Sequence, residues 1–404
     1  MNCRFCQEET NFVNNFGKMP IANGFHPTMD SDPYRFDLLT SFCDGCKLFQ
    51  IVNQPAKELM FHNNYPFFTG LSKSMTGHFW RLVEEVVLPE VKRIEDPFIV
   101  EIGSNDGTLL QRVKAEGIRH LGVDPSANVV DRAMSVGVNS LNVFFGEESA
   151  TSIRRDYGPA NVIVAANVIC HLPDLADLMR GICTLLDSEG VFIFEEPYLG
   201  SMLELVSFDQ IYDEHVFIFS LLSVSNICSR FGLELYDAVK QPTHGGSMRY
   251  FVGHIGQKIK SMRLQKLLEE EISNGLDKVQ TYLDFQNNCE LKKSNLNRLI
   301  ADIKRKGGRI SGYAATSKST TILNYCGIDS DSIDYICDST PEKINTFAPG
   351  SNIPVVSMDF MHSNQPDFLL LFAWNHEKEI MEKEKDLLHS SVRWIKLVPE
   401  IGVI

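Results

Sequence analysis

The chain has 404 residues, of which 44% are hydrophobic, and a formal net charge of −14. This length predicts two or three domains, because single hydrophobic cores rarely grow beyond about 250–300 residues. The acidic balance argues against nucleic acid as a partner, since a phosphate backbone needs a basic face. The longest apolar runs fall far short of the roughly 20 residues of a membrane span, so we expect a soluble, cytoplasmic, monomeric protein without a membrane partner.

Two cysteine pairs open the chain, Cys3-x2-Cys6 and Cys43-x2-Cys46. Four thiolates at this spacing can surround one zinc ion tetrahedrally, which leaves no open position for catalysis. We therefore expect a structural Zn²⁺ that folds a module of residues 1–62, remote from the chemistry. The alternative, two disulfides in a secreted protein, fits less well, because the other six cysteines lie singly in apolar stretches, as buried thiols do.

A helical pattern from residue 71 to 93 leads into alternating strands and helices. The predicted strands are rich in apolar and β-branched residues, which is typical of parallel strands buried on both faces. They cover residues 98–102, 120–123, 162–167 and 191–195. The alternation predicts an α/β domain with a doubly wound parallel sheet, over residues 63–255.

Residues 256–306 are polar, with leucines at helical spacing, and indicate long helices that join two domains. Strand patterns then resume and predict a second, smaller Rossmann-like sheet, so that the third domain covers residues 256–404. The strands of this sheet are expected at residues 309–313, 333–337, 354–357, 368–373 and 394–397.

The first strand of the central domain runs into a loop with the pattern Glu101-x-Gly103-x3-Gly107. Its glycines allow a sharp turn and a close backbone approach to a ligand. The spacing is that of the loop with which S-adenosylmethionine enzymes hold the amino-acid end of their cofactor. Asp124 ends the second strand, where a carboxylate can accept both ribose hydroxyls. The cofactor residues that we expect are Glu101, Gly103, Ser104, Asn105, Asp106, Gly107, Asp124, Phe145 and Asn167, with a core aromatic as the alternative role of Phe145.

Polar, titratable residues cluster in the segment Tyr212-Asp213-Glu214-His215. An imidazole beside carboxylates and a phenol is a general acid-base set, and we expect Glu214 to raise the pKa of His215 and to fix its tautomer. The alternative to a catalytic role is an ordinary solvated turn before a helix. His171 follows the strand at 162–167, so it should face the same edge of the sheet as the cofactor loop.

Six motifs in order along nearly the whole chain resemble the sugar C-methyltransferases of deoxysugar pathways. They are the two cysteine pairs, Glu101–Leu110, Asn167–His171, Tyr212–His215, Gly312–Lys318 and Asn324–Gly327. The resemblance implies a class I methyltransferase domain between a zinc module and a C-terminal domain that helps to hold a nucleotide-linked 4-keto-6-deoxysugar, of the thymidine diphosphate type. It also implies His215 as the catalytic base, with Glu214, Tyr212, His171 and Tyr65 around the sugar.

Two departures from the family pattern leave alternatives open. Tyr65-Pro66-Phe67 replaces a Tyr-x-Tyr pattern, and Ala314 replaces the second glycine of the C-terminal loop. The same scaffold acting on another small acceptor, at carbon, oxygen or nitrogen, and a non-catalytic binding module therefore remain alternatives.

The loop from Gly312 to Lys318 precedes a helix expected to begin near Ser317. Amides at a helix N-terminus beside a lysine form an anion site, so we expect Tyr313 and Lys318 to contact the nucleotide or its diphosphate. An ordinary strand-to-helix turn is the alternative. A carbon beside a ketone must lose a proton before it becomes nucleophilic, and this requirement gives the acid-base cluster its purpose.

Overall fold

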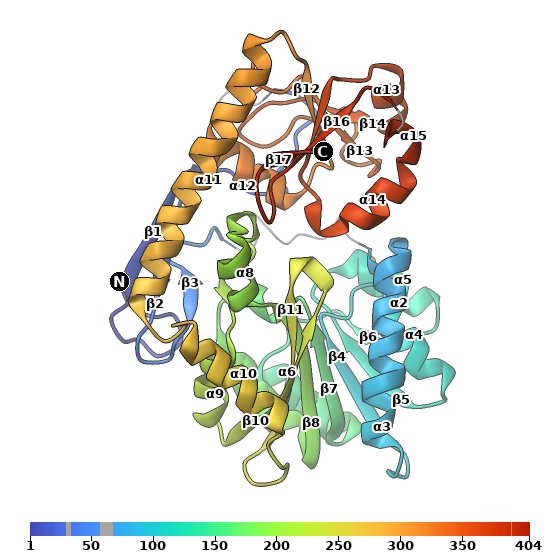
Figure 1. Ribbon diagram of the computed structural model, residues 1–404. Coiled ribbons are helices and arrows are strands. Elements are labelled where there is room, and N and C mark those ends of the chain that lie inside the picture. Colours follow the sequence, from blue (N-terminus) through green and yellow to red (C-terminus); the bar gives the residue numbers. More distant parts are fainter. Residues whose placement is uncertain (30–33, 57–67, 389) are drawn as a thin grey trace.

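The computed structural model describes residues 1–29, 34–56, 68–388 and 390–404. Three sheets form three structural units, and the long helix α11 (Val279–Arg305) runs beside all of them, from the central unit to the C-terminal unit (Figure 1). Within these ranges no helix is long and apolar enough to cross a membrane.

The N-terminal sheet is antiparallel and has the order β1-β2-β3-β9. Its strands are β1 (Asn11–Met19), β2 (Phe36–Phe42), β3 (Phe49–Ile51) and β9 (Phe217–Ile218). The last of them comes from the central part of the chain, two residues after His215, and pairs Phe217 with Gln50. The sheet of the cysteine module therefore ends next to the predicted acid-base cluster.

The central sheet has seven strands in the order β10-β11-β8-β7-β4-β5-β6. They are β4 (Phe98–Ile102), β5 (Arg119–Val123), β6 (Ser140–Leu141), β7 (Ala160–Ala166), β8 (Leu186–Pro197), β10 (Leu233–Gln241) and β11 (Ser247–His254). The strands from β8 to β6 in this order are parallel, whereas β11 is antiparallel to both β8 and β10. This is the predicted doubly wound α/β sheet, extended by an antiparallel strand at one side.

Both faces of the central sheet are covered, as the apolar strands predicted. In β7, Val162 and Val164 pack with the first helices, whereas Ile163 and Ala165 belong to the core on the opposite face. Successive strand side chains point to opposite faces, so a strand buried on both sides must be apolar throughout. The helices are α2 (Lys73–Leu82), α3 (Leu88–Val91), α4 (Thr108–Ala115), α5 (Ala127–Ser135), α6 (Glu147–Tyr157), α7 (Leu175–Leu185), α8 (Leu199–Leu205) and α9 (Leu221–Ser229).

Short helical turns lie at the edges of this unit, and several carry polar residues of the site. They are η1 (Thr69–Leu71), η2 (Val83–Val87), η3 (Ile169–His171), η4 (Phe208–Gln210) and η5 (Thr243–Gly245). The turn η3 follows β7, η4 follows α8, and η5 joins β10 to β11.

The C-terminal sheet has the order β14-β13-β12-β15-β16-β17 and is parallel except for β17. Its strands are β12 (Ile310–Tyr313), β13 (Ile336–Asp338), β14 (Val355–Ser357), β15 (Phe368–Leu371), β16 (Arg393–Lys396) and β17 (Gly402–Val403). Helix α10 (Met262–Ser273) packs against β10 and α9 of the central unit. The helices that accompany the C-terminal sheet are α12 (Ser317–Cys326), α13 (Met358–Ser363), η6 (Trp374–His376), α14 (Glu377–Lys383) and α15 (Lys385–Leu388). The predicted second Rossmann-like sheet is confirmed.

Candidate active site

The loop after β4 makes a turn that requires glycine at two positions. Gly103 and Gly107 have φ angles of +68° and +75°, in the left-handed region that other residues rarely adopt. A Cβ atom at Gly103 would also lie 2.6 Å from Val168 Cγ2. The loop is thus pressed against the turn that follows β7, and both predicted glycines have a structural reason.

Two carboxylates organise this loop. The Oδ2 atom of Asp124 accepts the amide of Asn105 at 3.0 Å, and its Oδ1 atom accepts the amide of Ser126 at 2.9 Å. Asp106 Oδ2 accepts the amide of Gly70 at 2.9 Å, which fastens η1 onto the loop. Burial raises the pKa of Asp124. The side chain is therefore held at the strand end, with lone pairs left for further donors.

The loop region fits S-adenosylmethionine in its polar chemistry. Three buried polar atoms have no hydrogen-bond partner among the described residues: Glu101 Oε2, Ser104 Oγ and Asn167 Oδ1. Burial, with the charges of Asp106 and Asp124, raises the pKa of Glu101. Buried polar atoms without partners are costly, and the amino group and ribose hydroxyls of the cofactor are donors that could satisfy acceptors of this kind.

Phe145 lies in the core, with 8% of its surface exposed. A Cβ atom added at Gly181 of α7 would lie 3.0 Å from Phe145 Cε1, so the ring packs closely against that helix. This is the core placement that the sequence left open as an alternative, and a contact of Phe145 with the cofactor stays a prediction.

The side chain of His215 has a fixed orientation and a fixed tautomer. Its Nδ1 atom lies 2.7 Å from the backbone carbonyl oxygen of Gln210, and its Nε2 atom lies 2.7 Å from the hydroxyl of Tyr212. A carbonyl oxygen can only accept, so Nδ1 carries the proton and Nε2 holds the lone pair. The nitrogen that can act as a base is thus the one beside Tyr212.

The expected effect of Glu214 on His215 is wrong. Burial, followed by the nearby His171, lowers the pKa of His215 well below its usual value. Glu214 instead accepts a hydrogen bond from Asn23 Nδ2 at 2.7 Å, and burial raises the pKa of this carboxyl. The correction has a physical reason: desolvation disfavours the imidazolium, and the tautomer is set by the carbonyl of Gln210 rather than by a carboxylate.

His171 lies beside His215, as expected from its place after β7. The ring centroids are 5.3 Å apart and the rings are inclined by 28°. Burial lowers the pKa of His171 to about 4, so this ring is also neutral near pH 7. The amide of Val216 donates to the carbonyl of Cys170 at 2.8 Å, which joins the two segments that carry the histidines.

Lys318 extends from the first turn of α12 toward this histidine pair. Its Nζ atom lies 4.9 Å from the ring centroid of Trp374 and 3.5 Å from Asn375 Oδ1. Within the described part of the chain it forms no ion pair, and burial lowers its pKa. Its charge acts on both His215 and His244. The predicted substrate lysine of the C-terminal unit therefore lies next to the predicted base.

Tyr313, the other expected substrate contact, points elsewhere. Its ring packs in the C-terminal core 5.2 Å from the ring of Trp394, and its hydroxyl donates to Glu384 Oε1 at 2.8 Å. Strand alternation explains this departure, because Tyr313 is the last residue of β12 and faces the helices behind the sheet. We therefore do not retain a substrate contact for Tyr313. Helix α12 begins at Ser317 as predicted, with Thr316 as its N-cap.

Two residues near the histidines were not identified from the sequence. Glu196, at the end of β8, accepts three consecutive amides with Oε1, and burial raises its pKa to about 7. His244 has a φ of +54°, and its buried Nε2 atom has no hydrogen-bond partner among the described residues. The pair Glu195-Glu196 at the end of an apolar strand could have identified Glu196 as a site residue from the sequence. The residues around His244 contain no comparable pattern. The amides that Glu196 holds are those of Val168, Ile169 and Cys170.

The four N-terminal cysteines converge as predicted. One ligand atom from each lies within 4.8 Å of all the others, with Cys3 Sγ 3.5 Å from Cys46 Sγ and Cys6 Sγ 3.3 Å from Cys43 Sγ. These separations exceed the about 2.05 Å of a disulfide bond and suit four thiolates around one Zn²⁺ ion. The donor set leaves no open coordination position, which indicates a structural site.

The remoteness of the zinc ion from the chemistry stays a prediction, but another segment of its module contacts the acid-base cluster. The amide of Ala22 donates to Asp213 Oδ1 at 3.1 Å, and Asn23 holds Glu214. The hydroxyl of Thr320, on α12, donates to the carbonyl of Ala22 at 2.8 Å. All three structural units therefore meet at the segment that carries His215. The predicted Tyr65 lies outside the described residues.

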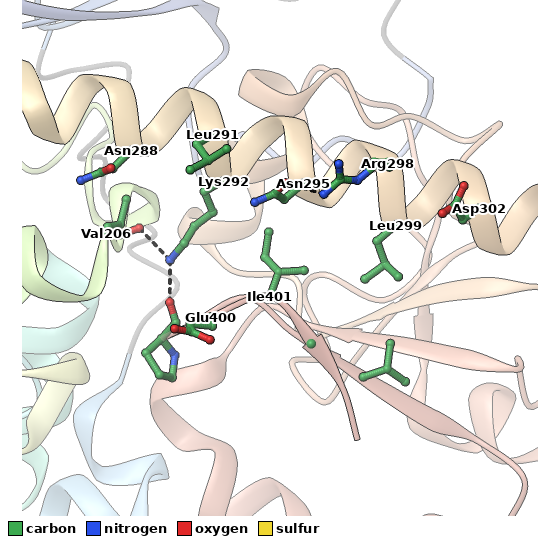
Figure 2. A pocket seen from close by; sticks show the side chains of 13 residues that line it. Val206, Asn288, Leu291, Lys292, Asn295, Arg298, Leu299, Asp302, Glu400 and Ile401 are labelled. Atoms are coloured by element: carbon green, nitrogen blue, oxygen red, sulfur yellow. Dashed lines mark hydrogen bonds between the residues drawn. The ribbon is translucent and has the colours of Figure 1, made fainter.

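A surface groove of about 670 Å³ lies away from these residues, between α11 and residues 399–403 (Figure 2). Lys292 projects from α11 toward it and donates to the carbonyls of Leu205, Val206 and Pro399, at 2.8, 3.2 and 3.1 Å. These bonds tie the end of α8 to the C-terminal unit. No residue that the sequence singled out lines the groove.

Comparison with known proteins agrees with this arrangement. Three family models match in order: a zinc binding domain at residues 3–61, a methyltransferase domain at 79–238 and a C-methyltransferase C-terminal domain at 242–399. C-methyltransferase NovU of Streptomyces niveus is 29% identical over an alignment of 406 positions, which covers 100% of this chain and 96% of NovU.

Among solved structures, magnesium protoporphyrin IX methyltransferase of Synechocystis, with bound S-adenosylmethionine, matches 44% of this chain and 80% of its own, with 14% identity and a TM-score of 0.33. An S-adenosylmethionine-dependent methyltransferase of Clostridium acetobutylicum matches 45% of this chain and 92% of its own, with 11% identity and a TM-score of 0.35. With the glycine loop, the four-cysteine cluster and the three matched domains on one chain, the protein is similar along nearly its whole length to S-adenosylmethionine-dependent C-methyltransferases that carry an N-terminal zinc-binding domain.

Proposed function

We propose that the protein methylates a carbon next to the ketone of a nucleotide-linked 4-keto-6-deoxysugar, of the thymidine diphosphate type, in deoxysugar biosynthesis. The similarity to C-methyltransferase NovU along the whole chain supports C-methylation. When bound, S-adenosylmethionine supplies a methyl group on a sulfonium centre. The residues of the chain must therefore bind the sugar, remove a proton from its carbon and hold the resulting enolate.

The observation that carries this proposal is the fixed tautomer of His215. Its Nδ1 atom donates to Gln210, so Nε2 holds the lone pair, which accepts the Tyr212 hydroxyl here and can take the carbon-bound proton when that hydroxyl turns aside. Because its pKa is well below the usual value, the ring is neutral and able to accept a proton at pH 7. Tyr212 hydrogen-bonds to the same nitrogen and can carry the proton onward. Transfer to oxygen or nitrogen would need less of this machinery.

The enolate oxygen needs a donor or a cation nearby. Lys318 supports this role, because it lies against the face of Trp374 without an ion pair in the described chain and acts electrostatically on His215. His244, whose Nε2 atom is buried and has no partner among the described residues, also supports this role, because it acts electrostatically on His215. We assign both to the oxygen of the ketone, with His171, Glu214 and Tyr65 placed around the sugar.

The C-terminal unit is proposed to contact the diphosphate through the start of α12. Most amides of this region are already used: Ala314 donates to the carbonyl of Cys337, Ala315 to Asp338, Thr316 to Ser319 Oγ and Ser319 to the N-cap Thr316, at 2.8, 2.7, 3.0 and 3.1 Å. The amides of Ser317 and Lys318 are the ones left to this role.

The test uses the purified protein with S-adenosylmethionine and a panel of thymidine, guanosine and cytidine diphosphate 4-keto-6-deoxysugars. Mass spectrometry should detect a gain of one methyl group with the thymidine diphosphate sugar. In deuterated water, with S-adenosylhomocysteine in the cofactor site, the ring hydrogen beside the ketone should exchange without methylation. His215→Asn should lose both reactions while it binds the cofactor normally. Tight cofactor binding without methylation or exchange on any keto sugar would contradict the proposal.

A further inference from the structure

Three potential metal ligands lie together, and one of them is the predicted base, His215. The sulfur of Cys170, a ring nitrogen of His171 and a ring nitrogen of His215 all lie within 4.8 Å of one another. Cys170 and His171 come from η3, and His215 comes from the segment between η4 and β9. One thiolate and two imidazoles form a typical zinc ligand set, with a fourth position left open.

The distances require only a small adjustment to hold a metal ion. Around a tetrahedral zinc ion, sulfur and nitrogen ligand atoms are separated by roughly 3.3–3.8 Å. The present separations are at most 4.8 Å, so the three ligand atoms need to approach one another by no more than about 1–1.5 Å. The backbone between them is already fixed, because Glu196 holds the amides of η3 and Val216 donates to the carbonyl of Cys170.

The hydrogen bond of His215 also suits a metal ligand. Ligating histidines usually donate their second ring nitrogen to a carbonyl or a carboxylate, which orients the ring and presents the other nitrogen. Here Nδ1 of His215 donates to Gln210 at 2.7 Å and presents Nε2. The hydroxyl of Tyr212, 2.7 Å from Nε2, would have to turn aside.

The surrounding charges act in both directions. Glu196 and Glu214 both act on Cys170, and their carboxylates favour a cation at this place. The positive charge of Lys318 acts on His215 and disfavours a cation at this place. The bonds that Zn²⁺ forms with a thiolate and two imidazoles can offset the repulsion from Lys318. Mg²⁺ prefers oxygen ligands, so the site favours Zn²⁺ over Mg²⁺.

We propose that Cys170, His171 and His215 form a second metal site, separate from the four-cysteine site, which binds Zn²⁺ and blocks the catalytic base. Binding forms one S–Zn and two N–Zn bonds, and the thiol proton is released to solvent. The lone pair of His215 Nε2 that binds the metal cannot take a proton from the substrate, so the metal inhibits. Metal binding stands independently of the proposed function, whereas the inhibition rests on it.

The binding experiment uses the full-length protein with its four-cysteine site loaded. After incubation with micromolar free Zn²⁺ and desalting, elemental analysis should give two zinc equivalents for the wild type and one for Cys170→Ala. With Co²⁺, the wild type minus Cys170→Ala difference spectrum should contain a thiolate-to-cobalt band. Calorimetry should show that Cys170→Ala binds Zn²⁺ at this site more than about 100-fold more weakly than the wild type. The loss of a residue that only hydrogen-bonds to a metal ligand already costs about 10- to 100-fold in metal affinity. Cys183→Ala, which removes a half-buried thiol bonded to the carbonyl of Phe231, is the matched control and should bind as the wild type does.

His171→Asn guards against misfolding of the cysteine variant and should also bind a single equivalent. Methyl transfer by the wild type should fall at least tenfold in Zn²⁺ and return with a chelator that leaves the first equivalent in place, whereas Cys170→Ala should stay active. One equivalent in the wild type, or two in both variants, would overturn the site. Binding of two equivalents with unchanged or increased turnover would overturn the inhibition alone. If no keto sugar is methylated even without added zinc, the proposed function fails and the metal counts still decide this inference.

Discussion

Asn23 of the zinc-binding domain donates a hydrogen bond to Glu214 at 2.7 Å, immediately before the predicted base in the sequence. This bond crosses from the first structural unit to the second and satisfies a carboxylate that is only 4% exposed. The N-terminal domain thus does more than fold around a metal, because it donates a hydrogen bond to the segment that carries the predicted base.

Asn23→Ala should destabilise the protein and lower its turnover. It leaves a buried carboxylate without this donor, which costs about 1–3 kcal/mol. It also removes an interaction that lowers the pKa of Glu214, so the carboxyl will protonate more readily. Thermal unfolding and steady-state rates measure both effects. Asn11→Ala, which removes an exposed bond to Asp44 in the same domain, is the control. Equal effects of the two changes would refute a specific role for Asn23.

The rate of methyl transfer should not fall when the pH is lowered from 7.5 to 6.5, and should decline only at a more acidic pH. The pKa of His215 is lowered by burial, so the ring loses its basic form only when the pH falls below this depressed value. The apparent acid pKa in kcat/KM should therefore lie clearly under 6.5, the usual value of histidine. A rate that already falls between pH 7.5 and 6.5 would contradict this prediction. It would mean either that the pKa of His215 is not lowered or that another group is the base.

Asp124→Ala should weaken S-adenosylmethionine binding, since charge-assisted hydrogen bonds to a ligand are worth about 1.5–3 kcal/mol each. Asp124→Asn keeps an acceptor for the loop amides and should lose less affinity for the cofactor. The difference between the two variants separates the effect of a disordered loop from the effect of the lost negative charge. Calorimetry gives the dissociation constants. Asp131→Ala, an exposed change on α5, should leave affinity unaltered. An unchanged constant in Asp124→Ala would remove this residue from the cofactor site.

Lys318→Met should lower kcat/KM by about 100-fold or more, the usual effect of losing one donor to a developing oxyanion. Lys318→Arg keeps the charge and should recover part of the loss. Cofactor binding should not change, because this lysine belongs to the C-terminal unit. The exposed Lys385→Met serves for comparison. A fall in affinity for the nucleotide sugar with unchanged kcat would place Lys318 at the diphosphate rather than at the ketone.

Cys43→Ser should release the structural zinc and reduce the yield of folded protein, because structural zinc contributes directly to folding free energy. Elemental analysis of the wild type should give about one tightly held equivalent at the four-cysteine site. Cys228→Ser, which alters a buried cysteine outside the cluster, controls for the loss of any buried thiol. A zinc content below half an equivalent in pure wild-type protein would argue against the site.

The sequence by itself determined the features that depend on local pattern. The cysteine pairs, the glycine loop and the apolar strands each need particular residue types at a fixed spacing, so the order of residues along the chain is enough to identify them. Strand ends such as Asp124 followed from the rule that parallel strands present their carboxyl ends at one edge.

Only the tertiary structure decided which distant segments meet and how each side chain is charged. The contact between Asn23 and Glu214 joins residues 191 positions apart, and no local pattern predicts such a pair. The presence of Glu214 next to His215 in the sequence suggested a raised histidine pKa. Burial, which only the folded structure shows, lowers this pKa instead. Tyr313 and Lys318 belong to one motif, yet the strand faces Tyr313 into the core while the helix start directs Lys318 to the histidines. Packing determines how far each titratable group is removed from water and where each side chain points, and packing depends on the whole fold.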